Sequence, residues 1–166
     1  MQKIDQHFLK TKLETTRTQL LDAIADLTHE QWTQPEIIEG LSVEELFHYL
    51  GLWQEEVNKG LREVQRRKKP TELMRDIEHH AKFRQRCIDE WVIYGRDDIL
   101  NKLEDAFWQL EVRIENFSVQ DLNDPKRFRF RGNQPLWPFI AQLTYEHEAH
   151  FLPQLEAYAK RIKEKG

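Results

Sequence analysis

Two histidines near the C-terminal end of the sequence, His147 and His150, are the side chains whose type and spacing best suit chemistry. Imidazole is the commonest metal ligand and general base near neutral pH. In a helix with about 100° between residues, His147 lies about +20° and His150 about −40° from Leu136, inside the apolar stripe. The pair is therefore predicted to share one inward face. Two interpretations stay open: a metal or acid–base site, or two core histidines that are hydrogen-bonded to neighbouring groups.

Tyr49 is a second candidate, on a helix that follows Ser42 and runs to about residue 67. With Leu46 as reference, Tyr49 lies at about −60°, at the edge of the apolar face, whereas His48 lies at about 200°. A tyrosine hydroxyl can donate a hydrogen bond, or act as an acid or base when its pKa is tuned. Tyr49, and not His48, is predicted to reach the interior.

The other reactive residue types are interpreted as structural. His79 and His80 are neighbours on a predicted helix, so at most one can face inward, and both are taken as surface or boundary residues. Cys87 lies near the inner face of its helix and is predicted to be an inert core residue. The basic residues at 66–69 and 127–131 could bind phosphate, but a solvated helix end explains them equally.

Helices are predicted to position these side chains. Glycine and proline are sparse, with six of each in 166 residues, and the apolar spacing indicates helices over about 5–27, 42–67, 71–94, 97–117 and 135–163. Thr28 with Gln31, and Ser42 with Glu45, have the spacing of capping boxes. Asp97 is predicted to cap the helix that follows it. Such amphipathic helices bury their stripes most simply as an all-α, up-down four-helix bundle with one extra helical segment at about 71–94.

Two local features are predicted to interrupt the helices. Arginine and phenylalanine alternate strictly between residues 127 and 131, which is typical of a short extended segment with one buried face. We therefore expect an extended loop near 126–131. Pro153 lies inside the last predicted helix and removes one backbone donor, so we expect a kink just after the two histidines.

Length and composition bound the class of protein. The 166 residues suit one domain, 1–166, and 39% of them are apolar. A single cysteine cannot form an intrachain disulfide, and no apolar run approaches the roughly 18–20 residues that span a membrane. The net charge of −4 disfavours nucleic acid as a partner. We expect a soluble, cytoplasmic, globular protein with no membrane partner.

Two segments carry a resemblance to a known family. The sequence LSVEELFHYL at 41–50, followed by Trp53, resembles the start of helix 2 in DinB-like proteins, especially those of the ClbS/DfsB type. GNQPLW at 132–137, followed by TYEH at 144–147, resembles the loop and final helix of that branch. The order of elements matches along nearly the whole chain. The resemblance implies a DinB-like four-helix bundle.

The resemblance also bears on a metal. The superfamily commonly binds a divalent metal through three histidines, one on helix 2 and two on the last helix. In the ungapped match these positions hold Tyr49, His147 and Phe151, with His48 and His150 each one residue early. We therefore predict an incomplete metal site, in which any divalent metal would be held by His147 and His150.

These observations lead to two functional hypotheses. The first is a pocket for a small molecule between helix 2 and the last helix, lined by Tyr49, Trp53, Trp137, Tyr145, His147 and His150. There His147 and Tyr49 would catalyse hydrolysis of, or addition to, an electrophilic small molecule. The second is a non-catalytic homodimer with structural histidines, in which Trp91 and Trp108 are the candidates for an exposed face.

Overall fold

The structure is a computed structural model that describes residues 2–91 and 94–165. It is all-helical, and the described residues contain no β-strand beyond an isolated bridge between Ile38 and Leu41. The three longest helices are α1 (Gln6–Ile24), α3 (Val43–Gln65) and α6 (Arg96–Glu115). The others are α2 (His29–Thr33), α4 (Thr71–Glu78), α5 (His80–Asp89), α7 (Val119–Asn123), the 3₁₀ turn η1 (Arg129–Arg131), α8 (Trp137–Leu143), α9 (Tyr145–Ala149) and α10 (Leu152–Lys165).

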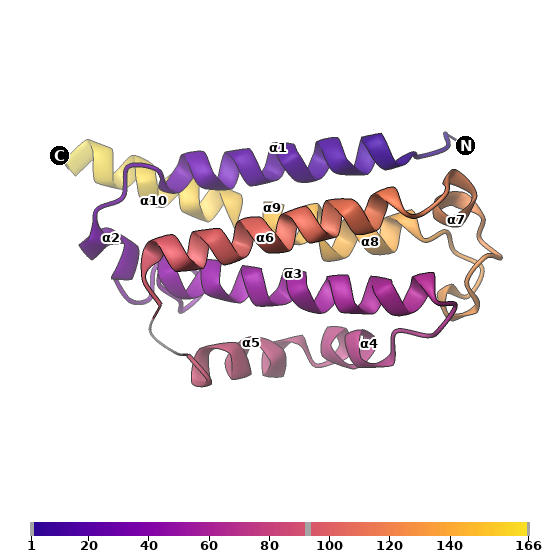
Figure 1. Cartoon of the computed structure of the whole chain (residues 1–166). Helices are drawn as coiled ribbons and strands as arrows, with labels where there is room; N and C mark the ends of the chain where they lie inside the picture. The colour runs from indigo at the N-terminus through magenta and orange to yellow at the C-terminus, as the bar shows by residue number, and fades with distance from the viewer. Residues whose placement is uncertain (1, 92–93, 166) are drawn as a thin grey trace.

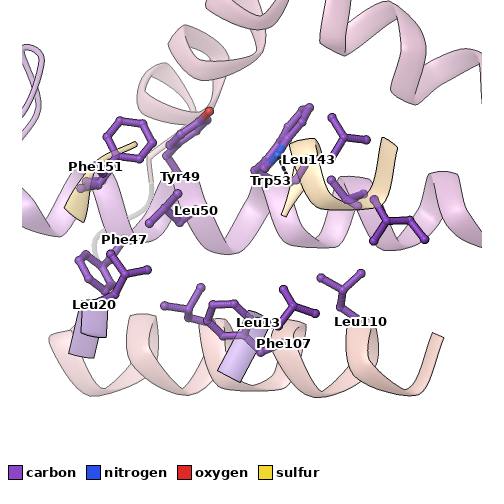
Figure 2. Close-up of a cluster of buried hydrophobic side chains, with 14 of the residues drawn as sticks. Leu13, Leu20, Phe47, Tyr49, Leu50, Trp53, Phe107, Leu110, Leu143 and Phe151 are labelled. Atoms are coloured by element: carbon purple, nitrogen blue, oxygen red, sulfur yellow. Dashed lines mark hydrogen bonds between the residues drawn. The ribbon is translucent and has the colours of Figure 1, made fainter. Parts of the chain in front are cut away.

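Helix α3 lies at the centre of the arrangement. It packs against α6 on one side and against α4 and α5 on the other, and α1 contacts α6, α9 and α10 (Figure 1). The predicted stripe of α3 is buried throughout, from Leu46 to Val64. Figure 2 shows Tyr49 and Trp53 on one side of α3, and Phe107 and Leu110 of α6 on the other. None of the described helices is both long enough and apolar enough to cross a membrane.

The capping predictions are confirmed in two of three cases. Thr28 and Ser42 each form a full capping box with the residue three positions later. Asp97 does not cap α6, because the helix begins one residue earlier, at Arg96, with Gly95 at the cap position. Asp97 lies instead in the first turn, where a carboxylate still favours the positive end of the helix dipole.

The helix predicted over about 71–94 is wrong in its continuity. It is broken at His79 into α4 and α5, and α5 ends at Asp89. His79 has φ −110° and ψ 45°, outside the helical region. Residues 92 and 93, near the end of the predicted helix, lie outside the described residues.

The prediction of an extended segment near 126–131 is only partly right. Phe128 has extended dihedral angles, but Arg129–Arg131 form one 3₁₀ turn that ends in left-handed Gly132. Phe128 and Phe130 nevertheless lie on the same side, as the alternation predicted. Their rings lie 6.4 Å apart, and that of Phe130 packs 5.4 Å from Phe139, so both aromatic residues serve the core.

The last predicted helix is interrupted twice. The break before Pro153 is confirmed, because α9 ends at Ala149 and α10 starts at Leu152. A second break at Thr144 (φ −115°, ψ −101°) was not predicted. It leaves the carbonyl of Leu143 without its helical partner, and the indole of Trp53 donates to that carbonyl at 2.9 Å (Figure 2). Tertiary contacts therefore compensate the break.

Gly60 is where α4 lies directly on the backbone of α3. A Cβ at this position would lie 2.2 Å from Leu73 Cδ2 and 2.8 Å from Leu73 Cβ, so α4 would have to move. We expect Gly60→Ala to lower the free energy of unfolding by about 1–3 kcal/mol, the usual cost of overpacking. Gly51→Ala is the control in the same helix, because its added Cβ would meet nothing closer than 3.9 Å, and there alanine should stabilise by up to about 1 kcal/mol. Denaturant unfolding of both variants measures the difference, and equal effects would contradict this packing.

Candidate functional site

The candidate site is centred on the hydroxyl of Tyr49, a fully buried residue in the first half of α3. This oxygen lies 3.0 Å from Nε2 of His147 and is also hydrogen-bonded to Nε2 of His80. The two imidazole rings lie 5.3 Å apart, centre to centre. Three helices, α3, α5 and α9, thus bring three polar groups to one point.

The interruptions of the helices explain how these side chains meet. His80 is the first residue of α5, directly after the turn at His79 that separates α5 from α4. His147 is the third residue of α9, which the break at Thr144 separates from α8. Because Trp53 holds the carbonyl before that break, α3 itself fixes where α9 starts. Helix α3 therefore both supplies Tyr49 and positions His147, its hydrogen-bond partner.

Aromatic rings enclose the three polar groups. The ring of Trp53 lies 4.6 Å from that of His80 and 5.7 Å from that of His147, centre to centre. The rings of Phe83 and Phe151 each lie 6.4 Å from the Tyr49 ring, edge to face. Edge-to-face contacts of this kind favour a fixed geometry. The polar groups consequently sit in surroundings of low polarity.

Burial keeps all three groups uncharged near neutral pH. It lowers the pKa of His147 to about 4, with the nearby His80 contributing, and it also lowers the pKa of His80. Burial raises the pKa of Tyr49. A neutral phenol has one proton, so Tyr49 donates to one Nε2 and accepts from the other. One imidazole therefore offers a lone pair and the other an N–H.

An ionic group borders this cluster. The guanidinium of Arg84 lies over the Tyr49 ring, 5.7 Å from its centre, and pairs with Glu39 at 3.3 Å. Glu39 also accepts from His150 at 2.8 Å and from Gln154 at 2.8 Å. Desolvation alone would raise the pKa of Glu39, but these hydrogen bonds outweigh it and lower the pKa. Glu39 is therefore a carboxylate that ties α5 to the start of α10.

A second buried polar pair lies next to the site. Gln54 on α3 donates through Nε2 to Oε1 of Glu148 on α9, and both residues are fully buried. Gln54 Oε1 and Glu148 Oε2 have no partner among the described groups while Glu148 is ionised. Burial raises the pKa of Glu148 well above its ordinary value. A protonated Glu148 would donate to Gln54, and the two side chains would then form a closed pair with two hydrogen bonds.

The structure brings together some of the predicted residues and separates others. Tyr49, Trp53 and His147 meet as predicted. His150 is exposed and hydrogen-bonds Glu39, so it does not share a point with His147. Trp137 and Tyr145 are half-buried against the core, with no ring contact or hydrogen bond to Tyr49 in the described part of the chain.

His80 is the residue that sequence reasoning missed. The apolar residues Met74, Ile77 and Ala81 indicate the inward face of the helix predicted over about 71–94, but none of them is fully buried. The buried residues are instead Leu73, Asp76, Phe83 and Cys87. His80 lies between Asp76 and Phe83 at helical spacing, so the stripe that starts at Leu73 would have pointed it inward.

The three-histidine metal site implied by the family resemblance does not fit these residues. The position on the last helix that would hold the second histidine is Phe151, whose ring packs 5.5 Å from His147. His48 packs against Trp91 at 4.3 Å and lines a different cavity. The groups that meet His147 are the hydroxyl of Tyr49, a neutral phenol and a weak ligand, and the imidazole of His80, so the set contains two histidines instead of three. The set is therefore suited to proton chemistry.

Two further observations complete the site. A cavity of about 280 Å³ is lined by Phe83, Cys87 and His48, and the ring of Phe83 also packs against that of Tyr49. The thiol of Cys87 is not poised to react, because burial raises its pKa to about 11.

A comparison with protein families, curated proteins and solved structures found no match for this chain.

Proposed function

We propose that this chain is a DinB-like helical-bundle protein of the ClbS/DfsB type that acts on a small electrophilic molecule by acid–base chemistry. The observation that carries the proposal is the Tyr49 hydroxyl, which is hydrogen-bonded to Nε2 of both His80 and His147. Polar groups gathered from three helices into aromatic surroundings are typical of small-molecule sites in helical bundles.

Each of the three side chains has a separate role in the proposed reaction. His80 is the less buried imidazole and acts as general base: its Nε2 takes a proton from water while the water oxygen bonds to the electrophilic carbon. The bond between this carbon and the leaving oxygen breaks as the new bond forms. The bound substrate draws the single O–H of Tyr49 away from His80, so that it donates a hydrogen bond to the leaving oxygen, where negative charge develops. The proton that His80 took from water then passes to the leaving oxygen. His147, neutral because burial lowers its pKa to about 4, orients the Tyr49 hydroxyl.

A substrate would approach the site past the ring of Phe83. The cavity of about 280 Å³ that Phe83 lines has room for a small molecule. A substrate in this cavity would have to displace the Phe83 ring to reach the Tyr49 hydroxyl. The substrate is therefore expected to be compact, with an apolar part that packs against Trp53 and Phe83.

The test is a screen for turnover of small electrophiles, such as activated esters, lactones and epoxides, with adjacent histidines as a matched pair. We expect His80→Ala to lower turnover by about 100-fold, the usual contribution of a general base. His79→Ala should leave turnover unchanged, because His79 is exposed and lies outside the site. Equal rates for the two variants would show that His80 is no base.

A second candidate function is self-association through α6. Trp108 is 63% exposed, and Val112, one helical turn later, is 38% exposed. Trp91 is half-buried against His48 and does not belong to this patch. A large exposed tryptophan next to a second apolar residue is typical of an interface.

We expect Trp108→Ser to convert a dimer into a monomer without unfolding the chain. The prediction follows because Trp108 lies mostly outside the core, so only an intermolecular contact is lost. Sedimentation velocity of wild type and variant measures the mass, and circular dichroism checks the fold. A wild type that is monomeric at every concentration would reject this candidate and leave the first untouched.

A further inference from the structure

Three carboxylates from two helices meet where α4 crosses α3, apart from the Tyr49 site. They are Glu56 on α3 and Glu72 and Asp76 on α4, and one carboxylate oxygen of each lies within 4.8 Å of those of the others. Glu72 is exposed, whereas Glu56 is only 8% and Asp76 only 4% exposed. Two buried carboxyl groups thus face each other, with a third at the surface.

The carboxyl groups of this cluster are only partly paired with groups of opposite charge. Within residues 2–91 and 94–165, no ion pair and no hydrogen bond from outside the cluster reaches Glu56. Asp76 Oδ2 is buried with no hydrogen-bond partner. Arg75 lies 3.4 Å from Asp76 Oδ1 and 3.7 Å from Glu72 Oε1, and Arg86 lies 3.8 Å from Asp76 Oδ1. A buried carboxylate oxygen without a partner costs several kcal/mol in general, so such an atom calls for a ligand.

The packing of α4 holds this arrangement in place. Leu73 lies against the backbone of Gly60, so closely that a Cβ there would clash. Gly60 is one turn from Glu56, and Leu73 is one turn from Asp76, so this contact fixes the two carboxyl groups opposite each other. The site is therefore formed before any ligand arrives.

We propose that Glu56, Glu72 and Asp76 bind a divalent cation of the hard, oxygen-preferring class, such as Ca²⁺, Mg²⁺ or Mn²⁺. Carboxylate oxygens are the ligands that these ions prefer, and the donor set offers neither nitrogen nor sulfur. A cavity of about 510 Å³ is lined by Glu56, Glu72 and Leu73, and also by the basic residues Lys59, Arg62, Arg66 and Lys69. It leaves room for the waters that complete the coordination of such ions. Glu72 lies at its exposed side, where the cation would enter.

A shared proton is the competing occupant of the same place. Burial, together with Asp76, raises the pKa of Glu56, so a proton between the two carboxyl groups would also relieve their repulsion. A cation would displace this proton and would engage Glu72 as well. A proton would leave Glu72 uninvolved, and that difference decides between them.

The experiment is calorimetric titration of the chelator-treated full chain with MnCl₂ and with CaCl₂, supported by thermal unfolding. We expect saturable binding at one site and stabilisation by the cation. Glu72→Gln changes an exposed ligand and should leave the fold intact while weakening binding by about tenfold or more. Asp76→Asn should weaken it at least as much.

Glu78→Gln is the matched control, because Glu78 is an exposed carboxylate of the same helix, outside the cluster. Its affinity for the cation should equal that of wild type. No saturable binding in the millimolar range, or equal binding by wild type and Glu72→Gln, would overturn the proposal in favour of the shared proton. The readout requires no turnover, so it stands or falls separately from the function of the Tyr49 site.

Discussion

Tyr49→Phe is expected to lower turnover of any substrate found in the screen by about 100-fold or more, while the chain stays folded. The substitution removes one oxygen atom and leaves the buried ring in place. That oxygen is the common partner of His80 and His147, so its loss removes the hydrogen-bond donor and the group that relates the two imidazoles. Donors placed at a developing negative charge contribute about 100- to 1000-fold to rates in general. Steady-state kinetics of the purified variant measures the loss.

Tyr158→Phe is the matched control for this prediction. Tyr158 is also buried, and its hydroxyl donates to the carbonyl of Gln31 at 2.8 Å, away from the site. The two variants each lose a buried tyrosine hydroxyl, so their effects on stability should be similar. If Tyr49→Phe and Tyr158→Phe retain the same turnover, the Tyr49 hydroxyl has no part in the reaction.

Glu148→Leu is expected to lower the free energy of unfolding by about 2 kcal/mol or more, whereas Glu148→Gln should change it by less than about 1 kcal/mol at low pH. Leucine leaves the fully buried Gln54 without a partner, and an unpaired buried amide costs about 1–3 kcal/mol. Glutamine at position 148 can keep both hydrogen bonds of the closed pair. Chemical denaturation measures both values, and equal losses would argue against a protonated pair.

The same pair sets a dependence of stability on pH. Burial raises the pKa of Glu148 in the folded state, outweighing the attraction of Arg17 and the hydrogen bond from Gln54. Above the unfolded pKa of about 4.3, the unfolded chain releases this proton and the folded chain retains it. The folded state then binds more protons, so stability falls as pH rises, by up to about 1.4 kcal/mol per pH unit.

Glu148→Gln should abolish this contribution. We therefore expect the free energy of unfolding of the variant to rise relative to that of wild type as the pH of the denaturation experiment increases from about 4.3. The reason is that only wild type carries the titrating carboxyl of Glu148. The gain should continue until the pH passes the folded pKa of Glu148. A constant difference between the two proteins over this range would show that Glu148 is ionised in the fold.

The part of the site that could be predicted from sequence lies on the regular helices. The stripe from Leu46 to Val64 on α3 is buried as predicted, and it places Tyr49 at the edge that meets His147. The inward direction of His147 was also predicted, because its angle depends only on the apolar residues near it. Where a helix is long and amphipathic, the spacing of its apolar residues is enough to predict on which face a side chain lies.

His80 could not be placed in the same way. Met74 and Ile77 are more obvious apolar residues than the stripe that is actually buried, which contains Asp76. One residue of register corresponds to about 100° of rotation, enough to turn His80 from the site toward solvent. In addition, the backbone leaves the helical conformation at His79, and no residue type in this segment predicts that break.

His150 shows the opposite error. Its predicted angle assumed one continuous helix, but Thr144 and the residues before Leu152 interrupt it. The first break depends on the Trp53 indole and on the Thr144 hydroxyl, which donates to Ile140 at 2.7 Å. The Trp53 contact is tertiary, so the local sequence does not contain that part of the signal. His150 consequently meets Glu39 and not the site.

Tyr49, His80 and His147 form one hydrogen-bonded group of uncharged side chains. The most direct test of this arrangement is the ¹⁵N NMR titration of the histidine rings in wild type and Tyr49→Phe, with His147 assigned from a His147→Gln variant. We expect His147 to stay neutral down to about pH 4, and the Nε2 resonances of both His80 and His147 to shift when the hydroxyl is removed. A His147 ring that titrates at its ordinary value of about 6.5, with Nε2 resonances unchanged in Tyr49→Phe, would show that the three side chains do not form such a group.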